Sequence, residues 1–201
     1  LNDDLIARLE AWIDEGAADP EVTVLHLRSD QKCFCAGADL AAMRACFATP
    51  EGSGAMLDTV KRMQRLFERI ESAAIVTLAE IGGAAMGGGL ELALACDLRV
   101  AAAEATLGLP EARLGLLPAA GGTQRLTRLC GEGTAKRLIL GAEPVDGAEA
   151  WRLGIVQWTL PRAELETWSR ELAARIGAMP KAALIASKRC IAAAADPLRR
   201  G

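Results

Sequence analysis

The strongest constraint in the sequence is a run of three consecutive glycines at residues 87–89. An apolar segment, residues 75–78, precedes the glycines, and a segment of good helix formers, residues 90–95, follows them. This order predicts a strand, a tight turn and the N-terminus of a helix. Such a turn can hold a negatively charged oxygen, because glycine lets a ligand approach the backbone and the first amides of a helix have no internal partner.

A single carboxyl group accompanies this turn. Glu91 stands three residues after Gly88 and therefore on the same face of the predicted helix. Amides aimed at an oxyanion, with an acid or base one turn away, would form a reaction centre. A structural interpretation stays open, because glycines also let a helix pack closely on a strand and a first-turn Glu complements the helix dipole. The spacing excludes a P-loop and the G-x-G-x-x-G dinucleotide motif.

A second small-residue turn lies at residues 32–40, after a predicted strand at residues 22–28. Ala36 and Gly37 leave its backbone amides approachable, as the glycine triplet does. On its own, this segment is equally typical of a plain connection between a strand and a helix. Residues 118–123 form a third turn that opens a helix.

Composition bounds the class of protein. The chain has 201 residues, of which 24% are charged and 51% hydrophobic, which is typical of one soluble domain or one domain with a small appendage. A net charge of −3 gives no electrostatic footprint for nucleic acid or an anionic membrane. We find no signal peptide and no apolar run of about 20 residues, so we expect a cytoplasmic protein with neither nucleic-acid nor membrane partners.

Cysteine and histidine usage points to carboxyl chemistry. The six cysteines are scattered in apolar segments, which favours a reducing compartment over a disulfide scaffold. Cys33 and Cys35 lack the CxxC spacing, and His26 is the sole histidine, so we expect no metal site. We expect His26 to be a packed or edge residue. With one histidine, a Ser-His-Asp or Cys-His enzyme is disfavoured, and carboxylates are the available acids and bases.

Periodicity predicts alternating strands and helices, and hence a parallel α/β architecture. Asn2 is the expected N-cap of the first helix, which would end at Gly16 with Leu5, Leu9, Trp12 and Ile13 on its buried face. A helix at residues 55–71 would place Met56, Val60 and Met63 in the core, after a loop at 50–54. Further helices are expected at 40–47, 124–130, 134–140, 148–153, 165–176 and 182–195, and strands at 97–102, 106–109 and 155–158.

Five motifs occur together in one order. They lie at residues 34–40, 83–97, 109–111, 118–126 and 148–156. In sequence and spacing they resemble the crotonase, or enoyl-CoA hydratase/isomerase, family. The resemblance implies an α/β fold: a crotonase-like spiral of ββα units at residues 1–160, with the start of a C-terminal helical region at 161–201. By the same comparison, N-terminal strands and closing C-terminal helices are expected to be missing.

The resemblance also implies a function and a site. It implies an enoyl-CoA hydratase that adds water to a 2-enoyl-CoA, with CoA as part of the substrate and no separate cofactor. The family's oxyanion hole falls on the amides of Ala36 and Gly88, and its two catalytic glutamates fall on Glu91 and Glu111. Substrate-binding positions fall on Gly37, Ala38, Asp39 and Gly87. Asp39 could equally cap the helix that follows it.

Local environment suggests how the two glutamates would divide the work. Glu91, at a helix N-terminus, would be ionised and act as the base. Glu111 lies among leucines, which disfavour charge, so it would hold a proton and act as the acid. The run at residues 87–97 looks close to the methylglutaconyl-CoA hydratase branch. Gly82, Glu80 and Ala119 depart from the usual family pattern.

Several alternatives stay open. The family resemblance implies a homotrimer or a dimer of trimers. It also allows double-bond isomerisation, another acyl-CoA reaction, or a catalytically silent crotonase-like subunit. The paired glutamates argue against the silent subunit, because a scaffold needs no carboxyl groups around an anion hole. RNA binding is disfavoured by the acidic charge and by three Phe with no Tyr.

Overall fold

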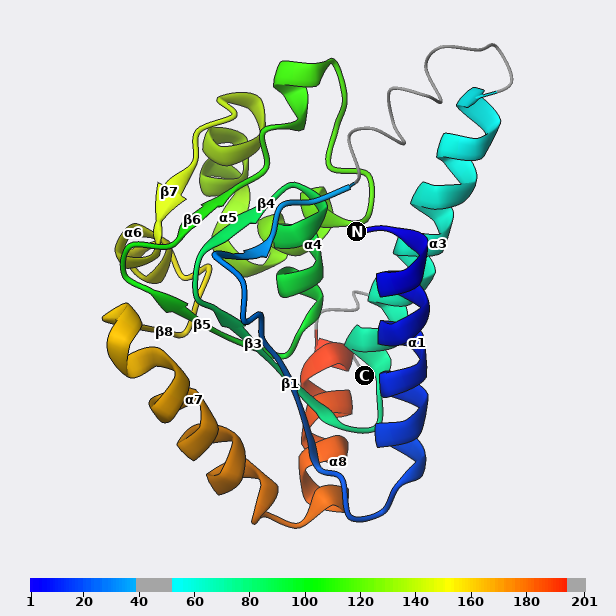
Figure 1. Cartoon of the computed structure of the whole chain (residues 1–201), viewed down its shortest axis with the longest axis vertical. Helices are drawn as coiled ribbons and strands as arrows, with labels where there is room; N and C mark the ends of the chain where they lie inside the picture. The colour runs from blue at the N-terminus through cyan, green and yellow to red at the C-terminus, as the bar shows by residue number, and fades with distance from the viewer. Residues whose placement is uncertain (39–51, 195–201) are drawn as a thin grey trace.

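The computed structural model describes residues 1–38 and 52–194, and it contains two four-stranded sheets flanked by helices (Figure 1). The first sheet is parallel throughout, in the order β1-β3-β5-β8. Its strands are β1 (Val24–Leu27), β3 (Val76–Ile81), β5 (Leu98–Ala102) and β8 (Trp158–Leu160). The second sheet has the order β2-β4-β6-β7, with an antiparallel pairing between β6 and β7. Its strands are β2 (Cys33–Cys35), β4 (Ala84–Met86), β6 (Thr106–Gly108) and β7 (Val145–Asp146).

Strands of the two sheets alternate along the chain and lead into helices. β3 and β4 are followed directly by α4 (Gly88–Ala95), and β5 and β6 are followed by the 3₁₀ helix η1 (Glu111–Leu114) and α5 (Gly122–Leu140). This is the expected succession of ββα units. The other helices are α1 (Asp3–Ala18), α3 (Gly52–Ser72), α6 (Gly147–Arg152), α7 (Arg162–Gly177) and α8 (Lys181–Ala194).

One contiguous core joins these layers. Fully buried side chains come from α3 (Leu66, Phe67, Ile70), from β3 (Leu78, Ile81) and from α4 (Leu90). Helices α1 and α3 contact each other and α3 contacts α4, while α7 packs against β1, β3 and β5 (Figure 1). Helix α4, buried along its whole length, therefore lies at the centre of the molecule. The proposed boundary at residue 160 stays a prediction.

The first helix differs from its predicted form at two points. Asn2 is the N-cap, as predicted, and accepts a hydrogen bond from the amide of Leu5. The helix does not end at Gly16 but continues to Ala18. Gly16 is instead buried at a close approach, where a Cβ would lie 3.2 Å from Ile75. Trp12 is 45% exposed, and Ile6 takes the buried position instead.

Other boundaries were also wrong. Residues 52–54 begin α3 rather than ending a loop, and the last strand is 158–160, not 155–158. The two helices predicted at 124–130 and 134–140 form one element with a break at Gly131, where φ is 79°. The short strands β2, β4 and β7 were not predicted, and β2 falls inside the segment predicted as a turn at 32–40. The helix expected at 40–47 lies outside the described residues. Among the described residues, no helix combines the length and apolarity needed to cross a membrane.

Candidate active site

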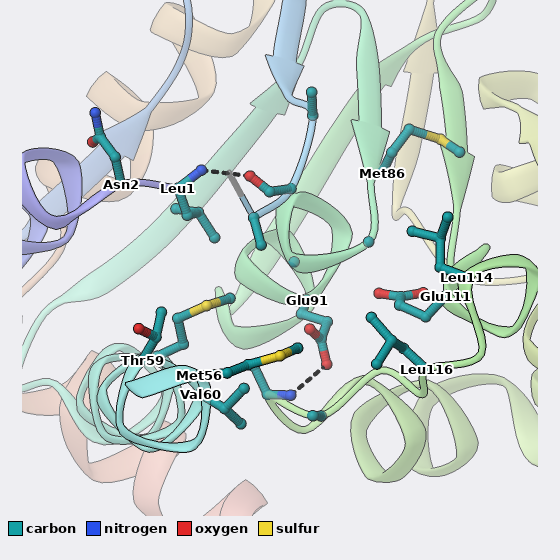
Figure 2. Close-up of a pocket in the computed structure, with 18 of the residues that line it drawn as sticks. Leu1, Asn2, Met56, Thr59, Val60, Met86, Glu91, Glu111, Leu114 and Leu116 are labelled. Atoms are coloured by element: carbon teal, nitrogen blue, oxygen red, sulfur yellow. Dashed lines mark hydrogen bonds between the residues drawn. The ribbon is translucent and has the colours of Figure 1, made fainter. Parts of the chain in front are cut away.

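A cavity of about 880 Å³ opens between the N-terminal end of α1, the residues after β2, helix α3 and the residues from β4 to α5 (Figure 2). Its lining includes seven of the predicted site residues: Ala36, Gly37, Ala38, Gly87, Gly88, Glu91 and Glu111. The structure thus brings together residues from three separate segments of the sequence. Asp39 lies outside the described residues.

The two predicted anion-binding turns contact each other. A Cβ at Gly37 would lie 2.8 Å from the carbonyl oxygen of Met86 and 3.4 Å from the amide nitrogen of Gly88. Gly37 has a φ of 97° and Gly87 a φ of 54°, which are conformations that residues with a side chain rarely adopt. Glycine at both positions therefore lets two turns, about fifty residues apart in sequence, meet at the cavity wall.

Gly88 is the first residue of α4, so its amide has no partner within the helix. The next glycine explains how this end of α4 is held, because a Cβ at Gly89 would lie 2.0 Å from the carbonyl oxygen of Cys35. Ala36 follows Cys35 directly. The close approach of the helix to the end of β2 places both predicted oxyanion positions, Ala36 and Gly88, on the same cavity.

Glu91 is held by a third turn. Its side chain is almost completely buried, with 3% of the residue exposed. Its Oε1 atom accepts hydrogen bonds from the amides of Ala120 (2.9 Å) and Gly122 (2.8 Å), at the N-terminus of α5. The predicted helix-opening turn at 118–123 therefore positions the carboxyl group of Glu91. Sequence reasoning recognised the turn but missed this role of Ala120 and Gly122.

Glu91 lies in the first turn of α4, as predicted, but its surroundings do not lower its pKa as this position alone would. Burial raises the pKa of Glu91 to about 7, and the charge of Glu111 adds to the rise. The amides of Gly122 and Ala120 and the charge of Arg125 oppose it. The carboxyl group is thus not simply ionised by its place in the first turn of α4, because the loss of hydration outweighs the favourable donors.

The surroundings of Glu111 agree with the prediction that they disfavour its charged form. It is the first residue of η1, and burial raises its pKa, as expected for a carboxyl group among leucines. Its Oε2 atom is buried and has no hydrogen-bond partner among the described residues. Its Oε1 atom lies 3.0 Å from the place where a Cβ of Gly87 would stand. Figure 2 shows the carboxyl groups of Glu91 and Glu111 facing the same space.

Apolar side chains form much of the remaining wall. Met56, Val60 and Met63 of α3 line the cavity (Figure 2). The prediction that these α3 residues serve the core was wrong for Met56 and Val60, which are half-buried and face the cavity. The helical periodicity was correct, but it could not distinguish a face packed on the core from a face that lines a hollow.

Two unusual residues at the end of β3 have structural partners. Glu80 is buried, and its carboxylate lies 3.0 Å from His26 and 3.6 Å from Arg28. Burial alone would raise the pKa of Glu80, but these two partners outweigh it and the pKa is lowered. His26 is on β1, an edge strand as predicted. At Gly82, a Cβ would lie 2.0 Å from the guanidinium of Arg162, so glycine leaves space for that side chain.

Comparison with known proteins gives a consistent result. A family model described as enoyl-CoA hydratase/isomerase matches residues 1–200. The chain is 41% identical to a probable enoyl-CoA hydratase of Bacillus subtilis over 78% of its own length and 59% of that protein. It is 40% identical to the mitochondrial methylglutaconyl-CoA hydratase of Homo sapiens over 80% of its length and 46% of that protein. The sequence identities are therefore too similar to show which of these two kinds of relative the chain resembles more.

Solved structures show the same fold. The enoyl-CoA hydratase of Bacillus anthracis superimposes with a TM-score of 0.89 at 36% identity, over 96% of this chain and 72% of that one. The chain spans 46% to 72% of the length of the curated relatives compared here, and less than two thirds of most of them. The fold of the described residues and the family of the sequence thus agree.

Proposed function

The chain belongs to the enoyl-CoA hydratase/isomerase, or crotonase, family, and on that premise we propose that it adds water across the 2,3 double bond of a 2-enoyl-CoA thioester. The observation that carries this proposal is that Glu91 and Glu111 face one cavity beside two contacting glycine turns. Hydration requires charge stabilisation at the thioester oxygen, a base for water and an acid for C2. The cavity offers a candidate for each.

The proposed reaction begins with the thioester oxygen between the amides of Ala36 and Gly88. As the water oxygen bonds to C3, electrons of the double bond move towards the carbonyl and the oxygen becomes enolate-like. The two amides stabilise this charge, and one such donor is typically worth about 2.7–4 kcal/mol of barrier. Collapse of the enolate with protonation of C2 gives the 3-hydroxyacyl thioester.

The hydrogen bonds of the two glutamates support the division of roles. Oε1 of Glu91 accepts from two amides, and such donors stabilise the ionised form. Oε2 of Glu111 is buried without a donor, which favours the protonated form. We therefore assign Glu91 as the base that takes the proton of water, and Glu111 as the acid that gives a proton to C2. Exchange with water then restores the starting protonation of both groups.

A labelling experiment tests the reaction. The protein is incubated with short, branched and long 2-enoyl-CoAs in water enriched in ¹⁸O, and loss of the conjugated absorbance is followed together with the mass of the product. We expect loss of conjugation with one labelled oxygen per product. Loss of conjugation without label would assign the double-bond isomerisation that the family also includes. No change with any substrate would favour a silent subunit.

The assembly and location of the protein are further parts of the proposal. We propose a homotrimer or a dimer of trimers, an acyl-CoA as partner and a cytoplasmic setting. Exposed apolar side chains outside the cavity, such as Leu57, Leu140 and Trp151, would be candidates for burial in such an assembly. Sedimentation equilibrium measures the assembly directly, and a monomer across the accessible concentration range would contradict it.

A further inference from the structure

The turn that precedes α5 binds Glu91 through two of its peptide groups. The N–H of one group belongs to Ala120 and that of the other to Gly122, and both donate to Glu91. The carbonyls of the same two groups belong to the preceding residues, Ala119 and Gly121. Because the N–H and C=O of a peptide group lie in one plane, a bond at the oxygen also fixes the direction of the N–H. The orientation of the Glu91 donors therefore depends on the partners of these two oxygens.

Both of these carbonyl oxygens have partners. The oxygen of Ala119 accepts from Nε2 of Gln64, a residue of α3, at 2.7 Å. The oxygen of Gly121 accepts from the backbone amide of Arg125 in α5, at 2.9 Å. The peptide group between them is also held, because the oxygen of Ala120 accepts from Nη1 of Arg125 at 2.9 Å. Three consecutive peptide groups of the turn are thus fixed at their carbonyl ends.

The guanidinium of Arg125 is in turn held by α3. Its side chain is only 9% exposed, and Nε and Nη2 lie 3.1 Å and 2.9 Å from Oε2 of Glu71. A planar fork can bond to a carboxylate and to a carbonyl at the same time. Gly121 leaves room for this fork, because a Cβ there would collide with Nη1. Helix α3 therefore reaches the turn by two routes, directly from Gln64 and from Glu71 through Arg125.

Charges from three elements act around Glu91. Burial raises the pKa of Glu91, the charge of Glu111 in η1 adds to the rise, and the charge of Arg125 opposes it. Helix α1 contributes Asp3 and Asp4 to the lining of the same cavity. Arg125 thus favours the ionised form of Glu91 against burial and against a neighbouring acid.

We propose that Arg125 and Gln64 are positioning residues for Glu91, because they hold the turn whose amides orient its carboxylate. The turn lines the cavity at Ala119 and Ala120. Arg125 and Gln64 line a neighbouring hollow of about 640 Å³, which the same two turn residues also line. Both side chains therefore act on the base through the turn. The inference deepens the proposed function, and its kinetic test rests on that function.

Two neighbouring arginines provide a matched test. Arg125→Met removes the fork and its charge, whereas Arg128→Met removes an exposed cation that lies 3.7 Å from the same Glu71 carboxylate. We expect the pKa of Glu91 to rise by at least about 0.5 in Arg125→Met and to stay within about 0.2 of the wild type in Arg128→Met. Side-chain ¹³C NMR titration of labelled glutamates measures it, with Glu91→Gln to assign the signal. The same Glu91 pKa in both variants would overturn the inference.

The pH profile of kcat/KM for hydration provides a kinetic readout. Because ionised Glu91 is the proposed base, we expect the acid limb of the profile to move to higher pH in Arg125→Met, by the amount found in the titration. We expect kcat at the plateau to fall by about 10–100-fold, with KM within about threefold of the wild type. Loss of a purely structural contact would lower activity without moving the limb. An unmoved limb would therefore overturn the inference.

Gln64→Met tests the second route and leaves Arg125 in place, so it remains decisive if Arg125→Met does not fold. Gln64 is exposed, and methionine keeps its length but removes the donor to Ala119. We expect a higher pKa of Glu91 and a kcat about 3–10-fold lower, because a peptide N–H donates less strongly once its carbonyl loses a partner. Gln124→Met, in the same hollow, is the control and should keep kcat within about twofold. Wild-type kcat and pKa in Gln64→Met would overturn the role of Gln64.

The titration separates this inference from the proposed function, because it requires no turnover. Suppose that no 2-enoyl-CoA is hydrated, but Arg125→Met still raises the pKa of Glu91 relative to Arg128→Met. The proposed function then falls, and the positioning of Glu91 stands. Hydration by the wild type, with the same Glu91 pKa in both arginine variants, would overturn the positioning and leave the proposed function standing.

Discussion

The acid and base chemistry of the candidate site depends on the different surroundings of two residues. Glu91 is buried and bonded to two amides of a distant turn, whereas Glu111 has a buried oxygen without a donor. Burial raises the pKa of both carboxyl groups, and that of Glu91 reaches about 7, where the group can both accept and give a proton near neutral pH. The pair is suited to proton transfer in both directions.

Replacing either glutamate tests this arrangement. We expect Glu91→Gln and Glu111→Gln each to lower kcat for hydration by about 10²–10⁴, with little change in the affinity for a saturated acyl-CoA, because an amide keeps the shape but cannot transfer the proton. Steady-state kinetics and calorimetry measure the two quantities. Glu132→Gln, at an exposed side chain, is the control and should retain full activity. Turnover near the normal rate in both site variants would exclude the two-glutamate mechanism.

The raised pKa of Glu91 also predicts a pH dependence of stability. In the folded state this pKa is about 7, against an ordinary value of 4.5, so the folded protein binds more protons than the unfolded chain between these pH values. The contribution of Glu91 to the free energy of unfolding is therefore fully present below about pH 4.5 and is lost as the pH rises through 7.

Glu91→Gln should remove this dependence. The amide is never ionised. We therefore expect the unfolding free energy of the variant, minus that of the wild type, to be larger at pH 8 than at pH 5 by on the order of 1–3 kcal/mol. Urea unfolding of both proteins at the two pH values measures the change, with Glu132→Gln as the control. The same difference between variant and wild type at both pH values would contradict the raised pKa.

At the scale of elements, the site is organised by α4, which is fixed at both of its ends. At its N-terminus, Gly89 lies directly against the carbonyl oxygen of Cys35. At its C-terminus, the buried guanidinium of Arg99 donates to the carbonyl oxygens of Ala93 (3.2 Å) and Cys96 (2.6 Å). A helix held in this way can present the Gly88 amide and Glu91 at constant positions.

The role of the Gly88 amide can be isolated by a matched pair of variants. Gly88→Pro and Gly88→Ala both add a Cβ, which would approach the flexible end of Met63 at 2.8 Å, but proline alone removes the amide hydrogen. Proline is compatible with the first position of a helix. We expect kcat of Gly88→Pro to be about 10²–10³ lower than that of Gly88→Ala.

Circular dichroism and steady-state kinetics together provide the measurement for this pair. Both variants should show the spectrum of the folded wild type, so that the difference in kcat reports the amide and not the fold. Equal activity in two folded variants would show that this amide does not stabilise the enolate.

On the scale of the whole molecule, one side chain ties the last described helix to the sheet and to α3. Lys188 of α8 lies 2.8 Å from the carboxylate of Asp97, which precedes β5, and donates to the carbonyl oxygens of Ile75 (3.1 Å) and Ile70 (3.4 Å). The same Asp97 oxygen accepts from the amide of Thr77 in β3. The contact therefore joins segments about ninety residues apart.

Loss of this contact should affect stability more than chemistry. We expect Lys188→Met to lower the unfolding free energy by about 1–3 kcal/mol, because two carbonyl groups and a partly buried carboxylate lose their donor. The kcat/KM for hydration should stay within about twofold, because Lys188 does not line the cavity. Lys136→Met removes an exposed ion pair and should change stability by less than about 0.5 kcal/mol. Equal losses of unfolding free energy in the two variants would contradict the role of Lys188 in holding α8 to the sheet and to α3.

The sequence predicted those parts of the protein that depend on local chemistry. Glycines at 87–89, the small residues at 36 and 37 and the cap at Asn2 predicted turns and helix starts, because the conformations they permit are properties of the residues themselves. The motif order added the family and directed attention to Glu91 and Glu111. The comparisons confirm the family and the fold, and the functional roles of these residues stay predictions.

The tertiary structure decided what could not be read along the chain. It placed the amides of Ala120 and Gly122 on Glu91, about thirty residues away, and it buried the Glu91 carboxyl group, which raises its pKa despite those two donors. It also turned Met56 and Val60 towards a cavity, and it formed strands as short as β7. These outcomes depend on burial and on contacts between distant segments. Sequence periodicity reports which side of a helix is apolar, but what that side faces is determined by how the elements pack.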